Sequence, residues 1–375
     1  MLSKCVVCEE ERLISKVLGV CVDCIRKRWE STESFVGLSH STSRAAFGLP
    51  SQPPRTQGGI VCNNCLNQCQ MGDGEEGYCG MRTNEGGRLS SLATLSQALA
   101  HIYLDPHVTN CCASYFCPAG TGAGYPRYAC TDGPEFGYFN LAVFFYGCGF
   151  DCLFCQNYSH KKVTNSPKVS RDNLLATILS NAKISCICYF GGSPEPQLPY
   201  AIKTSEEVLK ESKRTLRICW EWNGNGTKEL VKKASELSLV SGGNVKFDLK
   251  TLSPELSVAL SGVTNEGVYK NFEMVYQNYY QERSELPMLN ATTLLVPGYI
   301  DAHEVEGIAK FISEIDSGIP YRLLIFHPDY KMRDLPVTPL RQVRDCLRVA
   351  KKHIKDVNLG NKHLLSLSNK HLNRL

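Results

Sequence analysis

The chain has 375 residues, 43% of them hydrophobic and 21% charged, so it is long enough to bury a core and too apolar to be disordered. Its 41 lysine and arginine residues against 37 acidic ones leave a net charge of +4, which gives no reason to expect nucleic acid or a membrane surface as a partner. No apolar run approaches the roughly 18 residues of a membrane helix, and the N-terminus lacks an apolar signal core. We therefore expect a cytoplasmic protein.

The 19 cysteines are the most informative part of the composition. In a reducing cytoplasm thiols do not pair stably, so cysteines there usually bind metal, carry redox chemistry or pack as small hydrophobic residues. Their spacing along the chain decides among these roles.

The first segment, residues 1–30, holds two Cys-x2-Cys pairs, Cys5 with Cys8 and Cys21 with Cys24. Two chelating pairs across a short hairpin suit tetrahedral zinc, and a unit this small needs such a staple to fold. We predict a zinc-ribbon-like module here, with an iron–sulfur site or unoccupied thiols as the alternatives. Residues 31–58 are polar and contain Pro50, and we interpret them as a linker.

A second cysteine-rich segment, residues 59–140, is expected to bind metal and to pack on the core. It contains the pattern Cys-x2-Cys-x3-Cys-x9-Cys in a glycine-rich stretch, for which zinc and a second 4Fe–4S cluster are equally favoured: Cys62, Cys65, Cys69 and Cys79. Four further cysteines match no standard metal motif and receive no role: Cys111, Cys112, Cys117 and Cys130.

From residue 141 to 375 the sequence alternates between strand-like and helix-like stretches. Six β-branched or aromatic runs are separated by helical patterns: 141–146, 184–190, 215–221, 244–250, 291–296 and 321–326. This rhythm predicts an α/β fold, a partial (β/α)6 TIM-type barrel with a cysteine-rich N-terminal extension, and a doubly wound open sheet is the competitor. Cys186, Cys188 and Cys219 fall inside these runs and are expected to be small core residues.

A cysteine triplet follows the first of these runs, in the pattern Cys148-x3-Cys152-x2-Cys155 with Phe154 before the last cysteine. Three thiolates on one loop can hold three irons of a 4Fe–4S cluster and leave the fourth iron open to a small molecule with an amine and a carboxylate. A closed zinc site would require a fourth protein ligand.

The triplet resembles that of the radical SAM superfamily, and the chain is similar to its pyruvate formate-lyase-activating-enzyme-like group over roughly residues 59–365. The resemblance implies that Cys148, Cys152 and Cys155 hold the cluster and that Phe154 shields it. It further implies that S-adenosylmethionine (SAM) binds the open iron and is cleaved reductively to a 5′-deoxyadenosyl radical, with electrons from a donor such as ferredoxin or flavodoxin.

Further segments of that group have counterparts after the later predicted strands. The resemblance gives the cofactor-binding role to residues at four strand ends: Gly191, Gly192 and Ser193; Glu221 and Asn223; Asp248 and Lys250; and His327. An anion and a cation near the zwitterionic methionine end of SAM are chemically reasonable. Ser193 departs from the pattern, which has glutamate at this place.

The resemblance implies hydrogen abstraction from a protein or peptide substrate, either to activate a glycyl-radical enzyme or to modify a side chain. A radical SAM C-methyltransferase acting on a protein is an alternative, with cobalamin as a further cofactor, although no cobalamin domain is visible. The alternative from another functional class is a non-catalytic binding or adaptor protein whose fold is stabilised by metal ions.

Overall fold

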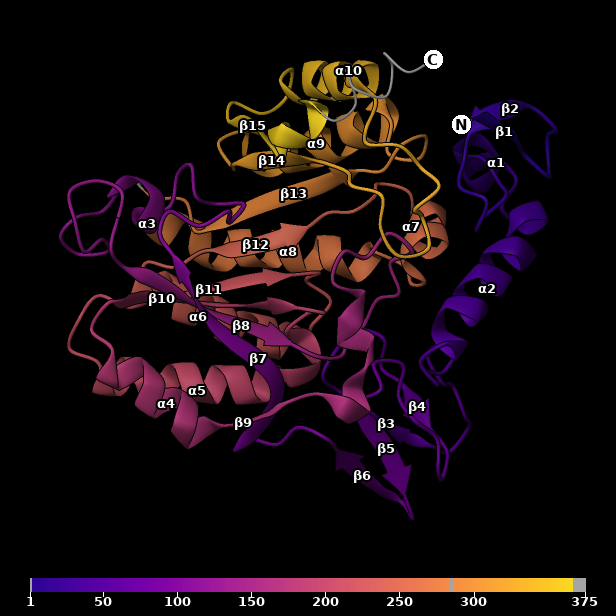
Figure 1. Cartoon of the computed structure of the whole chain (residues 1–375). Coiled ribbons are helices and arrows are strands. Elements are labelled where there is room, and N and C mark those ends of the chain that lie inside the picture. The colour runs from indigo at the N-terminus through magenta and orange to yellow at the C-terminus, as the bar shows by residue number, and fades with distance from the viewer. Residues whose placement is uncertain (1, 284–285, 367–375) are drawn as a thin grey trace.

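A sheet in the order β15-β14-β13-β12-β11-β10-β8-β7-β9 forms the centre of the computed structural model, which describes residues 2–283 and 286–366 (Figure 1). Its parallel strands are β8 (Phe139–Phe145), β10 (Ile184–Gly191), β11 (Arg217–Trp222), β12 (Val245–Asp248), β13 (Leu289–Leu295), β14 (Tyr321–Ile325) and β15 (Val357–Gly360). Two antiparallel strands extend the other edge: β7 (Gln97–Pro106) and β9 (Lys168–Ser170).

Helices cover the outer face of the parallel strands: α4 (Arg171–Ser180), α5 (Leu198–Glu211), α6 (Lys228–Ser241), α8 (Glu266–Tyr279), α9 (Ala302–Asp316) and α10 (Leu340–Ala350). A further helix, α7 (Pro254–Ser261), lies at the carboxyl ends of the strands, where the carbonyls of Ser261 and Leu260 accept hydrogen bonds from the loop after β8. Ser170 caps α4 as predicted, because its side chain accepts a hydrogen bond from the amide of Asn173. Short 3-10 helices complete the connections: η1 (Tyr158–Lys161), η2 (Val163–Asn165), η3 (Glu195–Gln197), η4 (Tyr280–Arg283) and η5 (Lys362–Leu364).

The two faces of each inner strand carry different side chains. On β10 and β11 the outward positions pack under the helices; Tyr189 stacks on Trp220, and Trp220 Nε1 donates to the carbonyl of Ala234 on α6. The inward positions hold polar groups and thiols that line cavities in the barrel interior. This alternation follows from the period of two in a strand, and it leaves a polar interior suited to chemistry.

The open side of the partial barrel is crossed by the segment after β7, which includes α3 (Pro118–Thr121). Arg322 on β14 donates from Nη1 to the carbonyl oxygens of Cys111 and Cys112, at 3.0 Å each. Residues 108–117 therefore connect the β7 side of the sheet to the β14 side.

The predicted fold class is confirmed, and all six expected strands are present within a few residues of their predicted bounds. β7, β15, α7 and α8 were not predicted. Among the described residues, no helix combines the length and apolar character needed to cross a bilayer.

The N-terminal module comprises β1 (Leu2–Lys4), β2 (Glu11–Leu13) and α1 (Val22–Lys27), and it is docked on the barrel. Arg26 pairs with Asp301 and with the buried carboxylate of Glu304, each at 2.9 Å. Tyr299 donates a hydrogen bond from its hydroxyl to the carbonyl of Val20.

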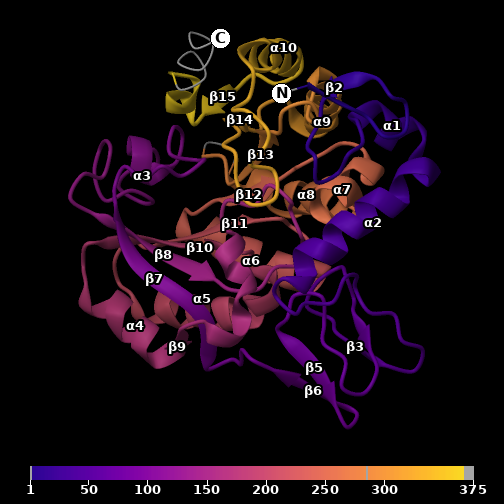
Figure 2. The same cartoon turned by 45° about the vertical axis from the view of Figure 1, so that its right-hand side comes forward.

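The prediction of a linker over residues 31–58 is wrong for its first half, because Trp29–Ala45 forms the helix α2. Its serines suggested a loop, but Ser39 Oγ donates to the carbonyls of Phe35 and Val17, and the helix packs beside α7 (Figure 2). Tertiary contacts thus outweigh the weak helix propensity of serine. Beyond α2 lie two small hairpins, β3 (Ile60–Val61) with β4 (Gln70–Met71) and β5 (Arg82–Glu85) with β6 (Arg88–Ser91).

Candidate active site

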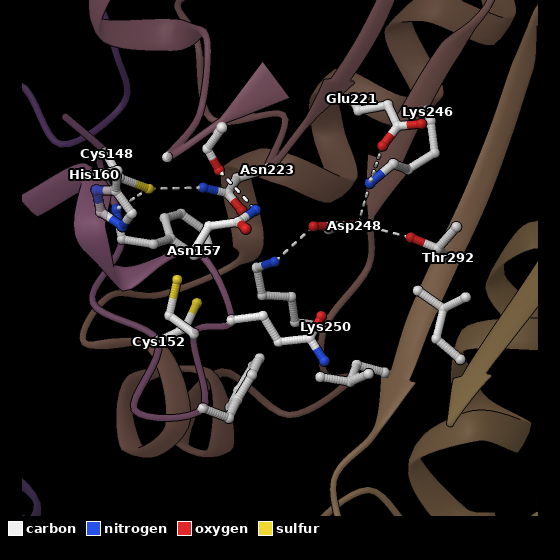
Figure 3. A pocket seen from close by; sticks show the side chains of 18 of the residues that line it. Cys148, Cys152, Asn157, His160, Glu221, Asn223, Lys246, Asp248, Lys250 and Thr292 are labelled. Carbon is white, nitrogen blue, oxygen red and sulfur yellow. Dashed lines mark hydrogen bonds and ion pairs between the residues drawn. The ribbon is translucent and has the colours of Figure 1, made fainter. Parts of the chain in front are cut away.

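The loop after β8 brings Cys148, Cys152 and Cys155 to one cavity at the carboxyl ends of the parallel strands (Figure 3). Cys148 Sγ accepts hydrogen bonds from the Phe150 amide at 3.3 Å and from Asn223 Nδ2 at 3.2 Å. Burial raises the pKa of Cys148 well above its ordinary value and that of Cys155 to about 12. Such thiols ionise readily only when a cation joins them, so the donor set fits a metal group.

The triplet loop is braced from behind by α2. Asp151, between the first two cysteines, accepts a hydrogen bond from His40 Nδ1 at 2.8 Å and one from Ser43 Oγ at 3.1 Å, and it pairs with the buried ammonium of Lys161. Burial alone would raise the pKa of Asp151, but His40 and Lys161 hold it well below its usual range. The helix that sequence reasoning read as a linker therefore positions the cysteine loop.

Asp248, at the end of β12, lies between two lysines on the opposite wall of the cavity (Figure 3). Its Oδ1 is 2.7 Å from Lys246 Nζ and accepts from Thr292 Oγ1 at 2.7 Å, while its Oδ2 is 2.8 Å from Lys250 Nζ. Burial opposes ionisation, but the two ammonium groups outweigh it and hold the pKa of Asp248 well below its usual range. The wall thus carries one carboxylate and two cations at neutral pH.

Glu221, at the end of β11, is shared between this wall and the segment that crosses the open side. One of its carboxylate oxygens is 3.8 Å from Lys246 Nζ, and the other accepts a hydrogen bond from the thiol of Cys111 at 2.9 Å. Cys112 lines the same cavity as Asp248. The crossing segment therefore forms part of the cavity.

Gly191 and Gly192 allow the end of β10 to approach the triplet loop closely. A Cβ on Gly191 would lie 2.6 Å from the backbone nitrogen of Phe145, and one on Gly192 would lie 2.3 Å from the carbonyl oxygen of Gly147. Gly191 also has a φ of +115°, a region that side chains rarely adopt. Any larger residue here would push the two strand ends apart.

Ser193 and Glu195 brace the neighbouring loop instead of lining the cavity. Ser193 Oγ accepts from the Asn223 amide at 3.1 Å, and Glu195 Oε1 accepts from the amides of Gly224 and Asn225 at 2.7 and 3.2 Å. Glu195 is fully buried, and this burial raises its pKa. Both residues fix the position of Asn223 beside Cys148.

His327 lies outside the cavity; its side chain is 48% exposed and its Nδ1 is 2.9 Å from a carboxylate oxygen of Asp329. A different histidine, His160 on η1, lines the cavity. Burial lowers its pKa to about 3, so it is neutral, and its Nδ1 atom has no hydrogen-bond partner among the described residues. It follows the triplet without any motif that would have singled it out.

Ten of the twelve predicted triplet and cofactor residues line this one cavity: Cys148, Cys152, Phe154, Cys155, Gly191, Gly192, Glu221, Asn223, Asp248 and Lys250. Sequence reasoning missed several further lining residues: Cys112, Phe150, Asn157, His160, Lys246 and Thr292. Lys246 had a signal, because it shares the inward face of its strand with Asp248 at a spacing of two residues.

The four cysteines of the N-terminal module meet in a tight group. Among the described residues they are the one set of His, Cys, Asp and Glu side chains whose ligand atoms all lie within 4.8 Å of one another: Cys5, Cys8, Cys21 and Cys24. Cys5 and Cys24 sulfurs are 3.8 Å apart, and Cys8 and Cys21 sulfurs 3.9 Å. A tetrahedral site with Zn–S bonds of about 2.3 Å has sulfurs about 3.8 Å apart, so the spacing fits a single zinc ion.

The second predicted quartet is assembled more loosely. The amide of Cys62 donates to the carbonyl of Cys69 at 2.9 Å. Burial raises the pKa of the Cys65 thiol well above its ordinary value, and the thiols of Cys79, Cys69 and Cys62 raise it further. They do not meet the 4.8 Å spacing of the N-terminal group. Asn67 Nδ2 donates to the carbonyl of Gly149 at 2.6 Å, which places this segment directly against the triplet loop.

Fold and site together define an α/β partial-barrel protein with a three-cysteine cavity at the carboxyl ends of its strands. The model of the radical SAM superfamily matches residues 142–312 of the chain. The family implies a 4Fe–4S cluster and SAM as cofactors, and the cavity's cysteines, carboxylates and lysines fit both.

Two proteins of Methanocaldococcus jannaschii are similar to the chain. One, named as a glycyl-radical enzyme activating enzyme, is 27% identical over 49% of this chain and 66% of its own length. The other, an uncharacterized protein, is 25% identical over 57% of this chain and 63% of its own length. The chain thus spans slightly less than two thirds of either relative. Among solved structures, Streptococcus suis SuiB bound to the precursor peptide SuiA shares 15% identity, with a TM-score of 0.45 over 60% of this chain and 49% of SuiB.

Proposed function

We propose that the chain is a radical SAM enzyme that binds its 4Fe–4S cluster through Cys148, Cys152 and Cys155 and abstracts hydrogen from a protein or peptide. The observation that carries the proposal is the meeting, in one cavity, of these three cysteines with the ionic wall of Asp248 and Lys250. A core cysteine cluster would need no such wall of buried charge.

Bound together, the cluster and SAM supply the electron and the adenosyl radical for hydrogen abstraction. The protein's part is to bind and orient. Lys250 offers an ammonium to the SAM carboxylate, and Glu221 and Asp248 offer carboxylates to its amine. The glycine pair at the end of β10 gives close backbone approach. Neutral His160 adds a hydrogen-bonding group without adding charge.

A protein substrate is supported by the relative named as a glycyl-radical enzyme activating enzyme. The outcome is activation of a glycyl-radical enzyme or modification of a side chain. The electron donor is a ferredoxin or flavodoxin.

Two further metal sites belong to the proposal. The N-terminal quartet holds zinc, supported by its sulfur spacing of 3.8 and 3.9 Å. The Cys62–Cys79 quartet holds zinc or a second 4Fe–4S cluster. We also propose that the enzyme works in the cytoplasm, where its cysteines would be kept reduced for metal binding.

The test is the formation of 5′-deoxyadenosine from SAM by anaerobically purified, dithionite-reduced protein. Replacing Cys148, Cys152 and Cys155 together by alanine should abolish it, whereas Cys346→Ala, at a buried cysteine on α10, should not. Undiminished product in the triple variant would overturn the assignment. A colourless protein containing zinc alone would favour a non-catalytic adaptor.

A further inference from the structure

A second cavity lies inside the barrel, next to the site described above, and half of the residues around it are cysteines. Five thiols face it, two from the segment that crosses the open side and three from β10 and β11: Cys111, Cys117, Cys186, Cys188 and Cys219. We call this cavity the thiol chamber. His107, Asn140 and Asn244 complete much of its wall.

The thiols on β10 and β11 are buried, as the sequence suggested, but they face the barrel interior and not the helices. Cys186 and Cys188 alternate with Ile187 and Tyr189, and only the latter pair faces the helices. The chamber thiols instead share the inward face with polar groups such as Arg217.

Nitrogen donors are directed at two of the chamber sulfurs. Arg217 Nε donates to Cys186 Sγ at 3.1 Å, and Asn244 Nδ2 donates to Cys219 Sγ at 3.6 Å. Arg217 is only 1% exposed, and Glu135 accepts from its Nη1 at 2.8 Å. A buried cation and amides pointing at sulfur stabilise thiolates and metal-bound sulfur, whereas uncharged packing thiols gain little from them.

The spacing of the thiols selects the kind of metal group. Among the described residues, the N-terminal quartet is the one group of three or more ligands whose atoms all lie within 4.8 Å of one another, so no three chamber thiols are close enough to share one ion. They surround about 40 Å³ of space, which at about 10–15 Å³ for each water-sized atom holds about three or four atoms. A two-iron, two-sulfide core is of that size and takes four cysteines.

We propose that the thiol chamber binds an iron–sulfur cluster of the two-iron type, separate from the one at the Cys148 loop. Its ligands come from the loop pair Cys111 and Cys117 and from the strand thiols of β10 and β11. The side chain of Cys111 lies beside Glu221, which lines the SAM cavity, so this cluster lies one side chain from that cavity.

The experiment compares two double variants of the full chain, Cys111→Ser with Cys117→Ser and Cys186→Ser with Cys219→Ser. Each is purified anaerobically and its iron and acid-labile sulfide are counted per chain. Each pair should lose about two irons and two sulfides relative to the wild type. Cys346→Ser, at a buried cysteine outside the chamber, should lose none. Full iron in either double variant, or zinc in place of iron in the wild-type chamber, would overturn the proposal.

A measurement on the unaltered protein covers the case in which a double variant does not fold. Crystals of the wild type grown without oxygen should give an anomalous scattering peak at the iron absorption edge between Cys111 and Cys186. A map with iron at the Cys148 loop and none in the chamber would reject the chamber cluster while leaving the proposed function intact.

Discussion

Lys250→Met is the substitution that best separates a cofactor-binding role from a structural one. Lys250 pairs with Asp248 at 2.8 Å, but Asp248 keeps Lys246 at 2.7 Å and the hydroxyl of Thr292 after the change. No buried carboxylate is therefore left without a partner. Methionine preserves most of the length and apolar stem of lysine, so the cavity should keep its shape.

The expected loss is that of one charge-assisted contact between the ammonium and the SAM carboxylate. Hydrogen bonds to charged groups contribute about 1.5–3 kcal/mol, which corresponds to about a 10- to 150-fold weaker affinity for SAM. Lys250→Met should show this weakening in a titration of SAM against the reduced cluster, followed by electron paramagnetic resonance, while its iron content stays at the wild-type level. Lys203→Met, at an exposed lysine on α5, is the matched control and should bind SAM normally.

A structural Asp248–Lys250 pair would behave differently. The variant would then have a lower melting temperature and an unchanged dissociation constant for SAM. That result would remove Lys250 from the site and refute the reasoning from the ionic wall.

The other predictions concern the supports of the site. Cys5→Ser with Cys24→Ser should remove about one zinc per chain by metal analysis and leave SAM cleavage intact; a preserved zinc content would reject the site. Asp151→Asn should lower the free energy of unfolding by about 3–5 kcal/mol, because Lys161 stays buried without its carboxylate; a change below about 1 kcal/mol in denaturant titration would contradict the ion-pair argument. Gly192→Ala should reduce the amount of bound cluster, because the new Cβ would lie 2.3 Å from a backbone oxygen of the cysteine loop. An iron content equal to that of the wild type would contradict this prediction, since it would show that the loop can move to make room.

Much of the barrel could be predicted because each parallel strand is a short apolar run followed by a helix pattern. β7 was missed because it lies towards the edge of the sheet and exposes Tyr103 and Leu104, so it has no clean apolar face. α2 was missed because its serines favour turns in isolation, and only the contacts of Ser39 and His40 with distant residues make it a stable helix.

The site residues could be predicted where they lie at the end of a strand, as Asp248 and Lys250 do. It could not be predicted where polar residues are hidden within strand patterns, as with Lys246 and Thr292, or where the partner is remote in sequence, as with His40 and Asp151. The roles of the cysteines inside strands could not be predicted, because a packing thiol and a ligating thiol look the same in the sequence until it is known which face of the strand carries them.

The central claim is that the Cys148 loop holds a cluster with an iron open to SAM. Electron paramagnetic resonance of the dithionite-reduced protein, recorded with and without SAM, tests it most directly. We predict a reduced 4Fe–4S signal that changes when SAM is added and that is missing when Cys148, Cys152 and Cys155 are replaced by alanine. A spectrum that SAM leaves unchanged, or a SAM-sensitive signal that survives the triple replacement, would contradict it.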